Sequence, residues 1–426
     1  MLDSQPHQRG RHADSGTLRR VLPGMLPGIT EYFAATLSGT ADGEPDWNEL
    51  KWRIARAVVV IHGISPLLSR RLTWVGPPGW HEFIVDQRIQ TASRYQRMAG
   101  LLAETDAGAI KAGIAFVPLK GAALHAMGLY TAGERPMADI DLLVRPQDLQ
   151  VMNGVLTTLG YRAVSATAEE HVMVPVNRPS QVHLSEHADN GITVEIHTAI
   201  RWPMPVRMVN ITPELWPVAP PPGRNEYPSL AALMGHLLMH VAVNMQTRIL
   251  RMVQLHDIAL LAPRLSAADW SELLNPGKGR PAPWWAMPPL RLTKRYYAGA
   301  IPDAAIAAVE RSCPRLLRIS APRLRLSDVS ASNARRPILP ALFWAGSWSE
   351  ALGCVSQRFY RGTQAVRGAP GTPDATELQP WITRSHRRRL FDVLLGRPRP
   401  ETIMMITAAL NGELSTASTQ KPPNAA

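Results

Sequence analysis

The sequence is poor in cysteine: its 426 residues include only Cys313 and Cys354. Two cysteines are too few for a disulfide scaffold, and they lie too far apart in the chain to form a metal-binding pair on their own. Long apolar runs are also missing, since the best candidate, residues 230–245, carries two histidines and an asparagine and predicts a buried helix. Residues 1–20 have charges but no apolar core after them, so they do not predict a secretory signal. We therefore expect a cytoplasmic protein with no membrane partner.

Lysine is scarce as well. Only six of the 46 basic residues are lysine, and the 34 acidic residues leave a formal net charge of +12. Such a charge can indicate an anionic partner, but the arginines are scattered apart from one dense run at residues 384–389, and no aromatic side chains interleave with them to stack bases. Scattered arginine with 38 prolines is typical of a GC-rich coding sequence. A solvated basic surface is therefore favoured, and nucleic acid is the less favoured partner.

The spacing of apolar residues divides the chain into an α+β core and helical surroundings. We predict a small mixed-sheet core with the order strand, turn, helix, strand, helix and hairpin, flanked by helical subdomains. The predicted units are a disordered N-terminus (1–27), a helical subdomain (28–112), the α+β core (113–212), a helical substrate-side domain (213–310), a mixed, mainly helical C-terminal region (311–410) and a flexible tail (411–426).

Short apolar runs and turn residues define the elements of the core. The hairpin is predicted from Asn190-Gly191, because Asn-Gly is the favoured pair for a type I′ turn. The predicted elements are strands at 114–119 and 138–144, helices at 121–130 and 147–160, and hairpin strands at 181–187 and 192–200.

Two aspartates stand one residue apart in the apolar run 138-ADIDLLV-144. Side chains two residues apart in a strand share a face, so Asp139 and Asp141 project together, and Glu195 and His197 do the same on a later strand. If the two strands lie side by side, three carboxylates converge and repel one another unless a cation lies between them. Oxygen ligands of this kind suit Mg²⁺, with Mn²⁺ as the alternative ion. The pattern therefore predicts a metal site formed by Asp139, Asp141 and Glu195.

A lysine and a glycine mark the turn from the first predicted strand to the first predicted helix of the core. Gly121 would let the backbone approach phosphate oxygens, and the N–H groups that begin the helix can bind an anion. Lys120 adds a positive charge at the same place. This dipeptide alone is a weak signal, but its order before the paired aspartates and the later Glu195 is specific.

This ordered set resembles the polymerase-β-type nucleotidyltransferase superfamily. Within it, 119-LKGAAL-124, 133-GERPMADIDLLV-144 and 194-VEIH-197 closely resemble a bacterial family of uncharacterised nucleotidyltransferases. The resemblance covers roughly residues 85–265 and implies an enzyme that moves a nucleoside monophosphate from a nucleoside triphosphate (NTP) such as ATP to an acceptor hydroxyl and releases pyrophosphate.

The resemblance also implies roles for single residues. Asp139 and Asp141 would hold two Mg²⁺ ions with the phosphates of the nucleotide, and Glu195 would complete the second metal site and activate the acceptor. These three are the predicted catalytic residues and metal ligands. The predicted nucleotide- and phosphate-binding residues are Lys120, Gly121, Arg135 and His197.

Three of these binding residues also have a structural interpretation. Lys120 either pairs with the triphosphate or caps the turn, and His197 either contacts the nucleotide or orients Glu195. Arg135, four residues before Asp139, either clamps phosphate oxygens with two hydrogen bonds or serves the fold.

The sequence departs from the family pattern at Ala122, Ala138 and Thr198. Ala122 lacks the hydroxyl that often binds phosphate, and Ala138 replaces a usual glycine or serine. Two alternatives therefore stay open: a degenerate relative that binds nucleotide or a protein partner without transfer, and a nucleic-acid-modifying enzyme. The acceptor is a small molecule, a peptide or a protein.

Two further features have mainly structural interpretations. His236 and His240 lie four residues apart on one helix face, but the glutamate of the zinc-protease pattern is missing between them, which favours a core pair. Asp257 is interpreted as an ion-pair partner of Arg248 or Arg251, or as a residue behind the site.

Overall fold

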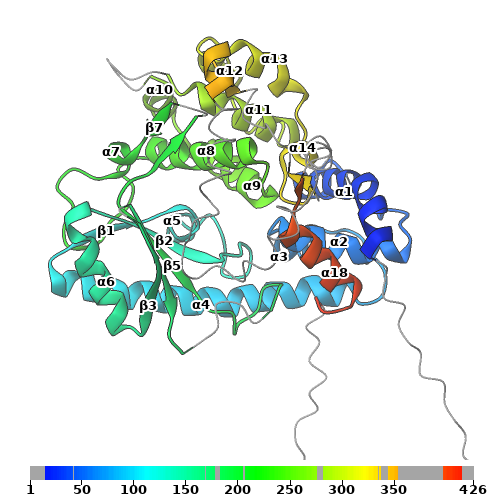
Figure 1. The fold of residues 1–426 in the computed structure, drawn as a ribbon, viewed down its shortest axis with the longest axis horizontal. Coiled ribbons are helices and arrows are strands. Elements are labelled where there is room, and N and C mark those ends of the chain that lie inside the picture. Colours follow the sequence, from blue (N-terminus) through cyan, green and yellow to red (C-terminus); the bar gives the residue numbers. More distant parts are fainter. Residues whose placement is uncertain are drawn as a thin grey trace, which may run out of the picture.

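The structure is a computed structural model with one mixed sheet and a larger helical body (Figure 1). It describes residues 15–41, 43–167, 169–177, 183–204, 207–275, 282–333, 335–336, 344–353 and 397–414. Within these ranges, no helix combines the length and the apolar character that crossing a bilayer requires.

The main sheet has six strands in the order β3-β4-β5-β2-β1-β8. β2 runs parallel to β5 and antiparallel to β1, so the sheet is mixed, which confirms the predicted α+β fold class. Two small sheets pair β6 (Arg201–Pro203) with β7 (Met208–Asn210) and β9 (Arg335–Arg336) with β10 (Arg397–Pro398). The strands of the main sheet are β1 (Ala115–Pro118), β2 (Asp139–Val144), β3 (Tyr161–Ala166), β4 (Glu170–Pro175), β5 (Thr193–His197) and β8 (Gly223–Arg224).

One face of this sheet is covered by helices α4 (Trp80–Ala112) and α6 (Leu149–Thr158). Ile140 and Leu142 on β2, with Ile196 on β5, are fully buried in the cluster that these helices complete. Because alternate residues of a strand point to opposite faces, the intervening polar residues project from the other side. Figure 1 shows α4 along one side of the sheet and helices α8 (Leu230–Thr247) and α9 (Met252–Leu261) on the opposite side.

The helical body joins segments from both ends of the described chain. α8 and α9 lie at its centre, and the late helix α18 packs on the early helix α2. Its other helices are α1 (Ser15–Ser38), α2 (Glu49–Ile61), α3 (Ser65–Leu68), α7 (Thr212–Leu215), α10 (Ala267–Leu274), α11 (Met287–Tyr296), α12 (Asp303–Glu310), α13 (Arg315–Ser320), α14 (Leu326–Val329) and α18 (Pro400–Leu410), and α5 (Lys120–Ala126) joins β1 to β2.

The N-terminal prediction of disorder is wrong for residues 15–27, which belong to α1. Leu22, Leu26 and Ile29 are spaced to form one apolar stripe, and all three are buried in the helical core. Burial of that stripe outweighs the two prolines inside the helix. Residues 1–14, about half of the predicted C-terminal region and the tail beyond 414 lie outside the described residues.

The predicted hairpin is also wrong. The antiparallel neighbour of β5 is β4, which itself pairs with β3. The Asn190 side chain accepts a hydrogen bond from the His183 main-chain N–H and donates to the carbonyls of His183 and Ser185. Asn190 is therefore bound within the loop that leads into β5, instead of forming a two-residue turn between strands.

Candidate active site

The polar face of the sheet brings the predicted acidic residues into register. β2 and β5 are parallel neighbours, with Asp141 beside Glu195 and Asp139 beside Thr193. Parallel partners in one row point to the same face, so the two carboxylates of the central row project together. His197, two residues after Glu195, shares this face. The sheet geometry therefore produces the convergence that the sequence predicted.

Four side chains form what we call the Asp141 cluster: Lys120, Asp141, Glu195 and His197. Asp141 Oδ1 accepts hydrogen bonds from Lys120 Nζ at 2.8 Å and from His197 Nε2 at 3.0 Å. His197 Nε2 lies 3.6 Å from Glu195 Oε2. One ligand atom from each of Asp141, Glu195 and His197 lies within 4.8 Å of the others, which is close enough for one metal ion.

The charges of the cluster act strongly on one another. Burial, together with the nearby charges of Asp141 and Glu195, raises the pKa of Asp139 to about 6. Burial also acts to raise the pKa of Asp141, but Lys120 and His197 hold it well below its ordinary value. Burial lowers the pKa of His197, yet its bonds to Asp141 and Glu195 raise it to about 9. The positive charges of Lys120 and His197 thus keep Asp141 ionised, whereas like charges raise the pKa of Asp139.

The donor set fits a hard divalent cation. Both protein donors to Asp141 use Oδ1, and within the described residues none contacts Oδ2. Glu195 adds carboxylate oxygens, and an ion there would offset the repulsion that raises the pKa of Asp139. Asp139 lies two residues before Asp141 on β2, beside Thr193, and is not part of the three-residue group. His197, predicted as a nucleotide contact, instead lies among the ligand atoms.

The turn before α5 places Lys120 at this cluster. Lys120 itself has a φ of +48°, in the left-handed region, whereas Gly121 does not. Its main-chain N–H points to Tyr227 Oη at 3.4 Å, and Tyr227 Oη lies 2.7 Å from His236 Nδ1 on α8. The strained lysine is therefore held from two sides, by Asp141 through its ammonium group and by the Tyr227 hydroxyl.

Gly121 has a reason in the structure that its sequence context does not reveal. A Cβ at this position would clash with Arg135 Nη1 and lie 2.7 Å from Met137 Sδ. Arg135 is thus packed directly against the turn that carries Lys120. The absence of a side chain at Gly121 makes this approach possible.

Arg135 belongs to a second group, which we call the Asp257 cluster: Tyr130, Arg135 and Asp257. Arg135 Nε and Nη2 donate to the two carboxylate oxygens at 2.8 and 2.7 Å, and the Tyr130 hydroxyl donates to Oδ1 at 2.7 Å. Two nitrogens of Arg135, which was predicted as a phosphate clamp, thus bind a carboxylate of the protein itself. Asp257 forms an ion pair as one interpretation predicted, but its partner is Arg135 and not Arg248 or Arg251.

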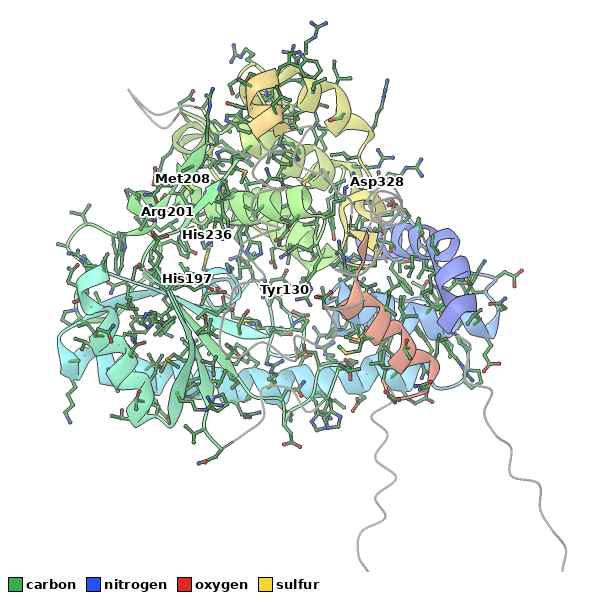
Figure 2. The ribbon with its side chains drawn as sticks, viewed as in Figure 1. Tyr130, His197, Arg201, Met208, His236 and Asp328 are labelled. Atoms are coloured by element: carbon green, nitrogen blue, oxygen red, sulfur yellow. The ribbon has the colours of Figure 1, made fainter. Side chains whose placement is uncertain are left out.

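The histidine pair on α8 serves the helical body. His236 bonds to Tyr227, and His240 Nε2 lies 3.0 Å from Gln254 Nε2. Figure 2 shows His236 on α8 above His197 on the sheet. Burial lowers the pKa of His236 to about 3, so this side chain is neutral. Both histidines are bonded to side chains of the helical body, as the interpretation of a core pair predicts.

Three residues near the site were missed by the sequence analysis. The Arg94 guanidinium donates to the carbonyls of Ala138 and Gly191, and so joins the segments that enter β2 and β5. Glu170 is the cross-strand neighbour of His197 on the same face. Tyr227 holds the Lys120 turn. Glu170 follows the alternation of a strand that was not recognised, whereas Arg94 and Tyr227 have no local signal.

The comparison with family models supports the resemblance of the motifs. A family model described as an uncharacterised nucleotidyltransferase matches residues 46–277, which is more than half of the chain. The matched segment extends from before α2 to just beyond α10 and includes both clusters. No curated protein and no solved structure matches the chain significantly.

Proposed function

Because the chain belongs to the family of uncharacterised nucleotidyltransferases, we propose that it moves a nucleoside monophosphate from an NTP to an acceptor hydroxyl with a divalent cation, Mg²⁺ or Mn²⁺. The observation that most supports this proposal is the parallel register that sets Asp141 beside Glu195. With His197 they offer ligand atoms within 4.8 Å of one another, next to the Lys120-Gly121 turn. Two neighbouring carboxylates, with Asp141 Oδ2 not bound by a described donor, can hold a divalent cation of the kind that assists phosphoryl transfer.

Asp141 and Glu195 would hold the ion, with Asp139 at the edge of the same face and His197 as the nitrogen ligand. When bound, a divalent cation stabilises the charge on the attacking and leaving oxygens of the transfer. His197 has a raised pKa, so it must lose its proton before it can bind a metal. Its bond to Asp141 holds the protonated form of the cluster together, and metal binding would require the release of that proton.

Glu195 is the carboxylate best placed to accept the proton of the acceptor. Its side chain is 27% exposed, whereas that of Asp141 is 6% exposed. The acceptor oxygen attacks the α-phosphorus, the bond from that phosphorus to the bridging oxygen breaks, and pyrophosphate leaves. A Glu195 carboxylate oxygen takes the hydroxyl proton. A general base must reach the proton it removes, and Glu195 offers more access than the buried Asp141.

Lys120 would supply positive charge to the phosphates. Its ammonium group is half-buried beside Asp141, and although burial lowers its pKa, the carboxylates of Asp141, Asp139 and Glu195 raise it overall. It therefore stays protonated at neutral pH. A phosphate oxygen that approaches the cluster would meet this fixed charge without first ordering a flexible side chain.

The test is transfer of label from α-³²P-labelled NTPs to cell extract in the presence of Mg²⁺ or Mn²⁺. The wild type is compared with Asp141→Asn and with Asp46→Asn, a matched change at an exposed carboxylate outside the site. We expect label transfer and pyrophosphate release in the wild type and in Asp46→Asn, and loss of both in Asp141→Asn. Equal transfer by Asp141→Asn would rule out the proposed role of this cluster.

Nucleotide binding without transfer is the second candidate. It is favoured by the two cationic groups that already occupy Asp141 Oδ1 and by Ala122, which is buried and offers no hydroxyl. Calorimetric titration with Mg²⁺ and NTP, followed by a pyrophosphate assay with many acceptors, separates the two. Binding without pyrophosphate release on every acceptor would favour this candidate.

A further inference from the structure

Arg251 precedes α9 and has a half-buried side chain with few partners. Its Nε donates to the Ile61 carbonyl at 2.9 Å, which ties it to the end of α2. Within the described residues, no carboxylate lies within ion-pair distance, and no acceptor binds either of its Nη atoms. The Nη groups of Arg251 are also absent from the buried, unpaired polar atoms of the described residues, so they remain available as donors to an anionic ligand.

The fold makes room for this guanidinium. Gly63, in the turn between α2 and α3, has a φ of +64°, and a Cβ there would lie 2.6 Å from Arg251 Nη2. The guanidinium therefore packs against the main chain of Gly63. Its Nε is held by the Ile61 carbonyl, and its two Nη groups can bind a ligand. Two parallel N–H groups of this kind match phosphate oxygens.

The position of Arg251 relates it to the candidate active site. Asp257 lies six residues further along α9, about 9 Å of helix rise, and it binds Arg135, which packs against Gly121. Burial lowers the pKa of Arg251, while the charges of Glu186 and Asp139 raise it. The guanidinium thus lies in the electrostatic field of the acidic face and not at the outer surface.

Arg251 differs from the other cations around that face, which each have a carboxylate partner. Those pairs are Lys120 with Asp141, Arg135 with Asp257, and Arg94 with Glu186. Among the described residues, Arg251 is therefore the arginine beside the acidic face that has no anion of its own.

We propose that Arg251 binds the polyphosphate of the nucleotide through its two Nη groups, in the role that the sequence assigned to Arg135. This inference rests on the proposed function, because it specifies the phosphate subsite of the same candidate active site. The carboxylates and their ion would hold the phosphates from the sheet, and Arg251 would bind them from the α2–α9 side. The Gly63 main chain is the floor of this subsite.

Arg56 offers a matched control. Its Nη2 donates to the Gly79 carbonyl at 2.8 Å, and Gly79 also has a positive φ, of +74°. Unlike Arg251, it has a partner for its charge, since its guanidinium lies over the Phe83 ring. Arg56→Gln therefore removes a half-buried guanidinium of the same construction away from the acidic face.

The experiment is calorimetric titration of the full chain with inorganic tripolyphosphate and with ATP in the presence of Mg²⁺. Tripolyphosphate carries no base and undergoes no transfer, so it reports the anion subsite alone. We expect Arg251→Gln to weaken tripolyphosphate binding about 10- to 100-fold. Arg251→Lys should weaken it less, because the charge remains but the paired N–H donors of the guanidinium are lost. Arg56→Gln should leave binding unchanged. Thermal unfolding of each variant checks that it is folded, and Arg251→Lys carries the test if Arg251→Gln does not fold.

The outcomes separate this inference from the proposed function. Equal binding by the wild type and Arg251→Gln would overturn the inference, whether or not the wild type transfers label. Binding that depends on Arg251, in a wild type that releases no pyrophosphate, would support the subsite and count against catalysis. A wild type that binds neither tripolyphosphate nor ATP would overturn both.

Discussion

The Asp141 cluster and the Asp257 cluster are built from the same kinds of groups but differ in how completely they are bonded. Asp257 accepts from Arg135 on both oxygens and from Tyr130 on one. Asp141 accepts both of its side-chain bonds on one oxygen, and burial and like charges raise the pKa of the neighbouring Asp139. The first arrangement stabilises the contact between the sheet and α9, while the second leaves capacity for a ligand.

This difference shows that residue type alone does not identify a binding site. In the sequence, a buried arginine that pairs with a carboxylate cannot be distinguished from one whose N–H groups are available to bind a phosphate. What distinguishes them is whether the hydrogen-bonding groups of the pair are already used. The predictions below test whether function follows the incompletely bonded cluster and stability the completely bonded one.

The largest effect is expected for Asp141→Asn, on activity. The change removes a charge where charge develops in the reaction, so transfer should fall on the order of 10³-fold. The free energy of unfolding should fall as well, because Lys120 and His197 lose the charge that holds the pKa of Asp141 low, although weaker repulsion of Asp139 and Glu195 offsets part of this loss. Single-turnover transfer and urea unfolding measure the two quantities. A large loss of stability with activity intact would reverse the assignment of the clusters.

Asp257→Asn should show the opposite pattern. It leaves Arg135 with a buried, uncompensated charge, and breaking a buried ion pair in this way costs about 3–5 kcal/mol of unfolding free energy. Protein that remains folded at low temperature should keep transfer activity within about tenfold of the wild type, since no reacting group is touched. Denaturant titration and rate per folded molecule check this result. A stable but inactive variant would place Asp257 in the catalytic machinery.

Gly121→Ala should connect the two clusters. The added Cβ clashes with Arg135 Nη1, and that guanidinium cannot easily move because Asp257 holds it on two sides. Overpacking of this kind costs about 1–3 kcal/mol of unfolding free energy. In the double variant Gly121→Ala/Asp257→Asn, Arg135 is free to move, so the added cost of Gly121→Ala should shrink. Strict additivity in this cycle would show that the clash is relieved elsewhere.

Acidification should lower the free energy of unfolding through His256, which lies beside the Asp257 cluster, and this effect should be smaller than those above. His256 packs near Tyr130, and burial lowers its pKa from 6.5 to about 4, although Asp257 acts to raise it. Between pH 6.5 and about pH 4, His256 is protonated in the unfolded chain but not in the folded chain. The free energy of unfolding therefore falls by up to about 1.4 kcal/mol for each unit by which the pH decreases. His256→Gln should reduce this slope in urea unfolding between pH 6.5 and 5. An unchanged slope would exclude His256 as its source.

The elements nearest the chemistry could be predicted because their patterns are local. β1, α5, β2 and α6 lie where apolar spacing and turn residues predicted them. The register of β2 with β5 followed from the alternation of acidic and apolar residues, since a slip by one residue would turn Glu195 toward the core. Local sequence therefore carried most of the information about the Asp141 cluster.

The pairings between distant segments could not be predicted in this way. Arg135 and Asp257 are 122 residues apart, and no local pattern selects Asp257 over other acids as the partner. The strand that neighbours β5 was likewise misassigned, because a favourable Asn-Gly turn signal competed with the weaker alternation of β4. Tertiary packing decided both cases, as it also did for the helix at the N-terminus.

The packing of α18 against α2 has a practical consequence for handling the molecule. Arg53 on α2 donates to the Leu410 carbonyl at the end of α18, and α1 also packs against α2. Figure 1 shows these three helices together at the end of the molecule remote from the sheet. A fluorescent reporter or a surface tether attached to α1 or α18 would therefore sit at the end remote from the carboxylates, so immobilised protein would keep the polar face of the sheet accessible even to a bulky acceptor.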